Sequence, residues 1–240
     1  MAQKKFKACL FDMDGTIINT EDIYTLAATE MLSRYGKGPL TWDIKLHLQG
    51  LPGPQASKRL LEHYGLDIAP EDWMAETFRV QETLWDRSDF LPGALELLQY
   101  LKEKEIPIAL GTSSNAKSFD KKTKHLQHGF QLFGKHVVTG DDPRIPPGRG
   151  KPQPDIWLVC LESLNKEREA QGQEPIDIED CLVFEDGIPG VISGINSKAT
   201  VVWIPHPEAL KELNGKEAEI IGDHHLLDSL ESFDKAYFGL

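Results

Sequence analysis

Short apolar runs recur along the chain, and most of them end at a polar or glycine-containing cluster. Their hydrophobic residues are continuous and do not alternate with polar ones, a pattern typical of strands that are buried on both faces. We therefore expect these runs to form a parallel sheet. They comprise residues 8–11, 106–110, 137–138, 181–184 and 200–204.

Amphipathic helical patterns lie between these predicted strands. Leucines recur at spacings of four and three from position 91 to position 101, beside Pro92, which suits the first turn of a helix. A second pattern follows Pro152 and places Ile156, Val159 and Cys160 on one face. Strands that alternate with helices predict a doubly wound α/β fold, Rossmann-like in arrangement. Residues 141–152 are expected to form a Pro/Gly-rich loop, and residues 165–179 a polar, solvated connection.

The interval from residue 19 to residue 86 interrupts this alternation, because no strand pattern occurs in it. We expect an all-helical domain inserted after the first strand. The predicted division is a core of residues 1–18 and 87–240 and a helical cap of residues 19–86. The cap's amphipathic patterns fall on three sets of residues: Ile23, Leu26, Ala27, Glu30 and Met31; Leu60, Leu61 and Tyr64; and Trp73, Phe78, Val80 and Leu84.

Composition and charge exclude several classes of protein. The chain has 240 residues, of which 40% are hydrophobic, enough for the core of one large domain or of a domain with an insert. No apolar run approaches the roughly 20 residues that span a bilayer. Lys and Arg total 26 against 38 Asp and Glu, so the net charge is −12, which disfavours nucleic acid and anionic lipid as partners.

The cysteines and the N-terminus bear on the cellular compartment. Cys9, Cys160 and Cys181 form no CxxC pair and lie in apolar contexts, as expected for free structural thiols in a reducing compartment. The apolar stretch after the basic N-terminus ends at Asp12 and is too short for a signal peptide. We expect a cytoplasmic protein.

The first polar cluster, at residues 12–16, carries two carboxylates at the end of a predicted strand. Asp12 at that position can attack phosphorus and form an aspartyl-phosphate. Asp14 is displaced by a turn at Gly15, and it can protonate a leaving oxygen and later activate water. An Asp-Gly turn without chemistry is the alternative, since this pair is a common turn signal.

Three further clusters follow later strands or loops. Residues 112–115, Thr-Ser-Ser-Asn, open a helix either as an anion site or as an ordinary N-cap. Lys151 stands before a predicted helix, where a cation opposes the helix dipole; it can neutralise a phosphoryl group or lie in solvent. Glu185 and Asp186 are adjacent acids at a buried strand end, where Mg²⁺ would relieve their repulsion. In open α/β sheets ligands bind at the carboxyl ends of the strands, so we expect these clusters to converge on one site.

Other polar and aromatic residues are not assigned a function. Lys117, Lys121, Lys122 and Lys124 form a basic stretch that Asp120 interrupts and that lacks interleaved aromatic residues. A solvated helix face explains this stretch better than contact with nucleic acid. The histidines lack the spacing of a zinc site. We expect Trp73, Trp85, Trp157 and Trp203 to pack in the core or at the domain junction.

With these clusters in order, the chain resembles the haloacid dehalogenase superfamily, in the subclass with a helical cap between the first and second motifs. The matching motifs are DMDGT at 12–16, LGTSS at 110–114, KP at 151–152 and FEDG at 184–187. The chain also resembles the pseudouridine-5′-phosphatase branch, and the resemblance covers essentially the whole chain. The stretches that carry it are residues 11–15, 106–114, 139–143, 151–157 and 181–186.

The resemblance implies a role for each acid. Asp12 would be the nucleophile and a metal ligand, and Asp14 would be the acid/base and bind the metal through its carbonyl oxygen. Asp186 would be a metal ligand, and Glu185 a ligand or an acid just outside the ligand shell. The implied cofactor is Mg²⁺.

The resemblance also implies how the phosphoryl group is held. Thr112 and the backbone N–H of Ser113 would bind it, and Lys151 would stabilise both Asp12 and the phosphoryl charge. The expected partner is therefore a small phosphorylated metabolite, with pseudouridine 5′-phosphate or a related nucleotide or sugar phosphate as the best candidate. Neither nucleic acid nor a membrane is expected as a partner, and we expect a monomer.

Three hypotheses compete with a phosphatase: a dehalogenase, a sugar phosphomutase and a non-catalytic binding module. Dehalogenases of this superfamily lack the second acid, which here is Asp14. Sugar phosphomutases carry a histidine on the first cap helix where this chain has Tyr24. A non-catalytic module that binds Mg²⁺ and phosphate would use the same pocket. Substrate specificity is expected in the cap, and the candidate loop is Gln49, Gly50, Leu51, Pro52 and Gly53.

Overall fold

The computed structural model describes residues 5–49, 51 and 53–240, and in it six parallel strands form a single sheet. The strand order is β3-β2-β1-β4-β5-β6, so the first strand lies in the middle and the chain winds outward in both directions. The predicted doubly wound α/β fold is confirmed. The strands are β1 (Ala8–Phe11), β2 (Ile108–Gly111), β3 (Val137–Val138), β4 (Cys181–Glu185), β5 (Thr200–Trp203) and β6 (His225–Leu226).

The strands differ from the predicted runs mainly at their ends. β2 begins at Ile108 and continues to Gly111, and β4 continues to Glu185. β6 is absent from the sequence prediction because its two residues form no apolar run, and it exists through its pairing with β5.

Successive residues of β1 point to opposite faces of the sheet, and each face has its own apolar core. Cys9 and Phe11 pack on the side of α5 (Ala94–Glu103) and α7 (Gln127–Phe130). Ala8 and Leu10 pack on the other side, against α8 (Asp155–Ala170), α9 (Ile188–Ser197), α10 (Pro207–Leu213) and α11 (Glu217–Ile221). All four residues of β1 are at most 1% exposed, which explains why a continuous apolar run was needed.

Helix α8 corrects the sequence prediction that residues 165–179 form a solvated connection. The helix continues through the polar residues to Ala170. Asn165, on the helix, exchanges two hydrogen bonds with the backbone of Ile176, at 2.9 and 2.8 Å. Because the returning chain is tied to the helix in this way, the polar end of α8 is ordered without an apolar face of its own.

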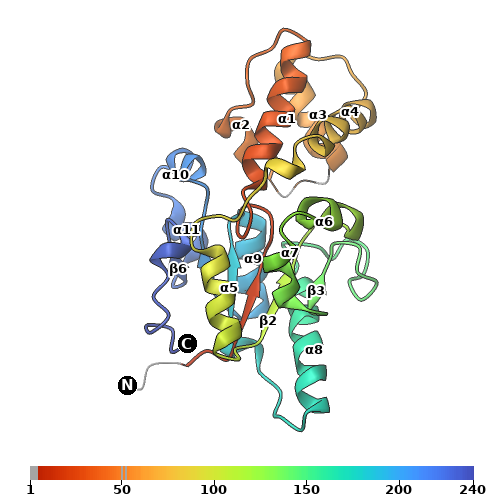
Figure 1. Ribbon diagram of the computed structural model, residues 1–240. Coiled ribbons are helices and arrows are strands. Elements are labelled where there is room, and N and C mark those ends of the chain that lie inside the picture. Colours follow the sequence, from red (N-terminus) through yellow and green to blue (C-terminus); the bar gives the residue numbers. More distant parts are fainter. Residues whose placement is uncertain (1–4, 50, 52) are drawn as a thin grey trace.

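Residues 20–87, the helical unit, form a separate group of helices with an apolar cluster of their own. In Figure 1 this unit lies above the sheet and its flanking helices. Its cluster includes Met31, Leu61 and Trp73, each at most 3% exposed. The three predicted helices are present, together with one short helix that was not predicted. The elements are α1 (Thr20–Arg34), α2 (Trp42–Leu46), α3 (Gly53–Tyr64), α4 (Pro70–Glu82) and the 3₁₀ turn η1 (Trp85–Arg87).

Two adjacent segments connect the helical unit to the sheet. Asn19 N–H donates to the carbonyl of Asp89 at 3.1 Å, and Asp89 N–H donates to Asn19 Oδ1 at 2.9 Å. Ile18 and Phe90 form an antiparallel bridge beside them. The chain therefore enters and leaves the helical unit at one place. Within the described residues, no helix is long and apolar enough to cross a membrane.

Candidate active site

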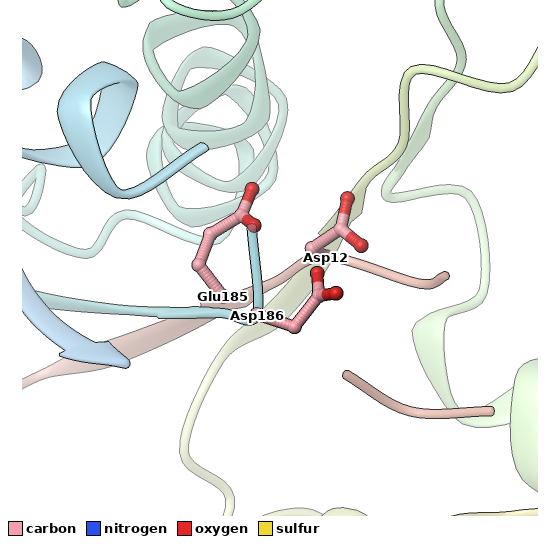
Figure 2. A group of neighbouring side chains, drawn as sticks. All are labelled: Asp12, Glu185 and Asp186. Atoms are coloured by element: carbon pink, nitrogen blue, oxygen red, sulfur yellow. The ribbon is translucent and has the colours of Figure 1, made fainter. Parts of the chain in front are cut away.

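Three carboxylates gather where β1 and β4 end (Figure 2). Phe11 of β1 pairs with Phe184 of β4, so Asp12 and Glu185 leave the sheet side by side, and Asp186 follows. One oxygen from each of the three acids lies within 4.8 Å of the others. Asp12 is 6% exposed and Glu185 is 2% exposed, so the parallel register of the sheet concentrates negative charge in a buried place.

Lys151 supplies a positive charge to this cluster. Its ammonium bonds to Asp12 Oδ1, lies 2.6 Å from Glu185 Oε1 and donates to the carbonyl of Gly111 at 3.1 Å. It also lies 4.6 Å from the centroid of the buried Trp157 ring. Burial alone would lower the pKa of Lys151, but Asp12 and Glu185 raise it above its ordinary value. Lys151 is therefore a buried cation and not the solvated loop residue of the alternative interpretation.

One ammonium does not balance three buried acids. Burial is the main reason that the pKa of Asp12 lies well above its usual range; Lys151 opposes this shift, and Glu185 adds to it. Burial also raises the pKa of Asp186 well above its usual range, with Glu21 as the next contributor. A cation bound here would offset both the burial of these acids and their mutual repulsion.

The donor set fits Mg²⁺. All three candidate ligands are carboxylates, the hard oxygen donors that Mg²⁺ prefers, and two of them are held by the ends of rigid strands. Glu185 Oε1 is buried, and its neighbour of opposite charge is the Lys151 ammonium at 2.6 Å, which the acid cluster shares. The side chain of Asp14 is not part of the cluster, and metal binding through its carbonyl oxygen remains a prediction.

Two glycines lack the side chains that would otherwise fill the space of the carboxylates. Gly15 has φ +79°, and a Cβ at this position would lie 2.3 Å from Asp186 Oδ2. A Cβ at Gly190 of α9 would lie 1.9 Å from Glu185 Oε1. Real side chains do not approach this closely, so both positions require glycine if the carboxylates are to keep their places.

Asp14 lies apart from the three clustered acids and is surrounded by donors. Thr20 donates to its Oδ1 at 2.7 Å, and Ser114 donates to its Oδ2 at 2.9 Å. The ammonium of Lys122 lies 2.6 Å from Oδ1. Burial would raise the pKa of Asp14, but Lys122 and these hydrogen bonds lower it below its usual value. The two aspartates of the first motif therefore occupy environments of opposite electrostatic character.

In the second polar cluster, residues 112–115, one residue caps a helix, and the residues predicted to bind phosphate precede it. Asn115 is the N-cap of α6 (Ala116–Thr123), because its side chain accepts from Ser118 N–H at 2.8 Å. Thr112 is fully buried, and its hydroxyl accepts from Ser114 N–H at 3.1 Å. Within the described part of the chain, Ser113 N–H donates to no other group. The residues predicted to bind phosphate thus lie before the capped helix, with one backbone donor available.

Lys122 corrects the prediction that the lysines of α6 form a solvated face. Its side chain is 1% exposed, and its ammonium lies 2.6 Å from Asp14 Oδ1. Helical spacing could have predicted this burial. Lys122 lies three residues after Phe119 and next to Thr123, on the inward face of α6. Lys121 follows the prediction better, since it is about one-third exposed and pairs with Glu82 of α4.

The helical unit also contacts the core through aromatic stacking at α2. The Trp42 ring of α2 stacks on His206 at 4.4 Å between centroids, and His206 Nε2 lies 3.3 Å from Asp22 Oδ1. The loop proposed for specificity lies between α2 and α3. Gly50 and Pro52 fall outside the described residues, and among those described, Gln49, Leu51 and Gly53 make no hydrogen bond or ion pair with the core.

Comparison with known proteins identifies the family. A family model for haloacid dehalogenase-like hydrolases matches residues 6–198. The chain belongs to this family. It is 54% identical over 234 residues to a probable pseudouridine-5′-phosphatase of Saccharomyces cerevisiae, covering 98% of this chain and 97% of the relative. A probable pseudouridine-5′-phosphatase of Drosophila melanogaster is 32% identical over 99% of this chain and 95% of its own length.

The solved structures agree with this placement. The crystal structure of a family IA haloacid dehalogenase hydrolase from Entamoeba histolytica superposes with a TM-score of 0.74 and 25% identity, over 97% of each chain. Members of this family typically use Mg²⁺, in keeping with the acidic cluster. The chain is thus a haloacid dehalogenase-like phosphatase, a hydrolase of phosphoric monoesters.

Proposed function

We propose that this phosphatase is Mg²⁺-dependent and works through an aspartyl-phosphate on Asp12. The observation that carries the proposal is the separation of two aspartates only two residues apart. Asp12 lies in the acidic cluster with Lys151, whereas Asp14 lies in a pocket of hydrogen-bond donors. Two neighbouring carboxyls in contrasting environments suit a nucleophile and an acid/base.

In the first step a carboxylate oxygen of Asp12 forms a bond to phosphorus. Asp14 takes up a proton as the negatively charged phosphate binds beside it and raises its pKa, and it gives this proton to the leaving oxygen as the bond from phosphorus to that oxygen breaks. Thr112 and Ser113 N–H hold the phosphoryl oxygens, and Lys151 offsets their charge together with that of Asp12. The alcohol product then leaves.

In the second step Asp14, now a carboxylate, takes a proton from water. The water oxygen bonds to phosphorus, the bond from phosphorus to Asp12 breaks, and inorganic phosphate is released. Mg²⁺ held by Asp12, Asp186, the Asp14 carbonyl and directly or indirectly by Glu185 would stabilise negative charge on the phosphoryl group. Asp12 returns to its initial state, so no other reactant is consumed.

The domain division of 1–18 and 87–240 against 19–86 enters the proposal as a core and a lid. The paired connections at Asn19 and Asp89 would act as the hinge, and contacts at Trp42 and Lys121 would support the closed position. A lid excludes bulk water during the first step and admits one water for the second. The core would bind the phosphate, and the lid would select the leaving group.

Pseudouridine 5′-phosphate is the proposed substrate, with related nucleotide or sugar phosphates as the wider class. Support comes from the relative at 54% identity, a probable pseudouridine-5′-phosphatase. A sugar phosphomutase is a weaker candidate. Tyr24 stands where a mutase has histidine, and its hydroxyl accepts a hydrogen bond from Lys122 at 2.5 Å.

Release of phosphate from 4-nitrophenyl phosphate is expected with Mg²⁺, and it should fall by about 100-fold or more when EDTA removes the metal, because the acidic cluster then lacks its cation. Activity should return when Mg²⁺ exceeds EDTA. Full turnover in EDTA would contradict the metal requirement. Absence of release under every metal condition, across a panel of nucleotide and sugar phosphates, would favour the non-catalytic module.

Changes in the loop at 49–53 should alter substrate preference. Replacing Gln49 or Leu51 by alanine is expected to change kcat/KM for pseudouridine 5′-phosphate by about tenfold, the effect of losing one or two contacts to the leaving group. The rate with 4-nitrophenyl phosphate should stay within about twofold, because the core would bind the phosphoryl group. Equal slowing of every substrate would contradict a specificity role.

A further inference from the structure

Lys122 is a buried cation that belongs to none of the four motifs. It lies on α6, and its ammonium donates to Asp14 Oδ1 at 2.6 Å and to Ser114 Oγ at 2.8 Å. Its third donor reaches the hydroxyl of Tyr24 at 2.5 Å. An ammonium has three donors, so this one is saturated, and a residue 1% exposed is held in a single geometry.

The walls around this ammonium come from the helical unit. It lies 4.9 Å from the centroid of the Tyr24 ring on α1 and 5.1 Å from the Trp85 ring on η1. The two rings contact each other edge to face at 5.5 Å. Burial raises the pKa of Tyr24 to about 12, so its hydroxyl is neutral and Asp14 provides the negative charge in direct contact with Lys122.

Holding the helical unit against the core does not explain this arrangement. Lys121, the preceding residue on α6, makes an ion pair with Glu82 of α4 at partly exposed side chains. An exposed pair carries little desolvation cost, whereas a buried lysine is costly unless it is paired. Lys121 already links α6 to the helical unit, so what Lys122 adds is its contact with Asp14.

We propose that Lys122 is the positioning residue for Asp14 and that Tyr24 makes this positioning depend on the seating of the helical unit on the core. This inference rests on the proposed role of Asp14 as the acid/base. Thr20, the first residue of α1, and Ser114 each donate to one carboxylate oxygen of Asp14, and Lys122 adds a link from Asp14 to Tyr24, one turn further along α1. When the helical unit moves away, Tyr24 leaves the ammonium, and Asp14 loses part of the support for its orientation.

The consequence is a specific effect on the departure of the leaving group. A poorly leaving oxygen needs a proton from a well-placed Asp14, whereas a good leaving group departs without it. The value of kcat/KM covers every step through that departure. Phenyl phosphate and 4-nitrophenyl phosphate are similar in shape and differ in the basicity of the leaving oxygen, so their ratio of kcat/KM reports the positioning of the acid.

The test measures this ratio in four proteins: wild type, Lys122→Met, Tyr24→Phe and the control Lys117→Met, at an exposed lysine of α6. For Lys122→Met we expect kcat/KM to fall at least about tenfold more with phenyl phosphate than with 4-nitrophenyl phosphate, as for impaired proton transfer. Tyr24→Phe should shift the ratio in the same direction by about threefold, because one of three hydrogen bonds is lost. Lys117→Met should leave the ratio at the wild-type value, because its side chain is exposed.

Equal losses with both substrates in folded Lys122→Met would overturn the proposal, and so would a shift of the ratio in Lys117→Met as large as that in Lys122→Met. If Lys122→Met fails to fold, Tyr24→Phe decides: a wild-type ratio overturns the proposal, and a shifted ratio supports it. Wild-type protein that hydrolyses neither substrate contradicts the proposed function itself. An active wild type with an unchanged ratio in the variants contradicts only the role of Lys122.

Discussion

Asp12→Asn is expected to lower turnover by at least about 1,000-fold, a barrier increase of roughly 4 kcal/mol. An amide oxygen is a poor nucleophile, so the aspartyl-phosphate cannot form at this position. The fold should persist, because Asp12 lies among repelling carboxylates and the variant removes one negative charge from that cluster. Steady-state phosphate release and circular dichroism on the same preparation would check both expectations.

Asp142→Asn is a matched control for that substitution. Asp142 also follows a strand, β3, but its carboxylate pairs with Arg144 at 2.6 Å in the loop. This variant should keep nearly the wild-type rate. If Asp12→Asn retained more than about a tenth of the rate, a barrier change below about 1.4 kcal/mol, Asp12 could not be the nucleophile.

Lys151→Met should have the second largest effect, a loss of about 100-fold to 1,000-fold in kcat/KM. Removing a preorganised charge that stabilises a transition state typically costs roughly 3–4 kcal/mol. The variant also leaves the buried carboxylates of Asp12 and Glu185 without their ammonium. Its melting temperature without metal should therefore fall, and Mg²⁺ should raise it by more than it raises that of the wild type.

Lys135→Met serves as the control for the loss of a lysine. Lys135 is exposed and pairs with Glu167 at 2.9 Å, on the face that α8 presents to solvent. Activity and melting temperature should both stay close to the wild-type values. A Lys151→Met protein with normal activity and a normal response to Mg²⁺ would contradict the assignment of Lys151 to the site.

Local patterns predicted those parts of the molecule whose signal lies within a few residues. A continuous apolar run identified β1, because a strand buried on both faces needs every residue to be apolar. The end of that run located Asp12, and the end of the run at 181–184 located Glu185 and Asp186. The spacing of apolar residues also located α1, α3 and α4 in the helical unit.

The sequence patterns did not predict those elements whose conformation depends on contacts with other segments. β6 has two residues and exists by pairing with β5, and the end of α8 is held by contact with Ile176. α2 has five residues, too few for a periodic pattern to be recognised. None of these elements has a hydrophobic pattern long enough to be recognised, so their conformations are set by contacts with other segments.

The sequence by itself determined that four polar clusters follow the predicted strands and that the acids and Lys151 have the chemistry of phosphoryl transfer. Only the tertiary structure decided how those charges are shared between two sites. Lys151 lies with Asp12 and Glu185, whereas Lys122 crosses 108 residues of sequence to reach Asp14. The physical reason is that a lysine in a polar helix favours solvent until its neighbours exclude water. Lys122 is buried because the helical unit covers α6 with Tyr24 and Trp85, and the charge of Asp14 then compensates for its burial.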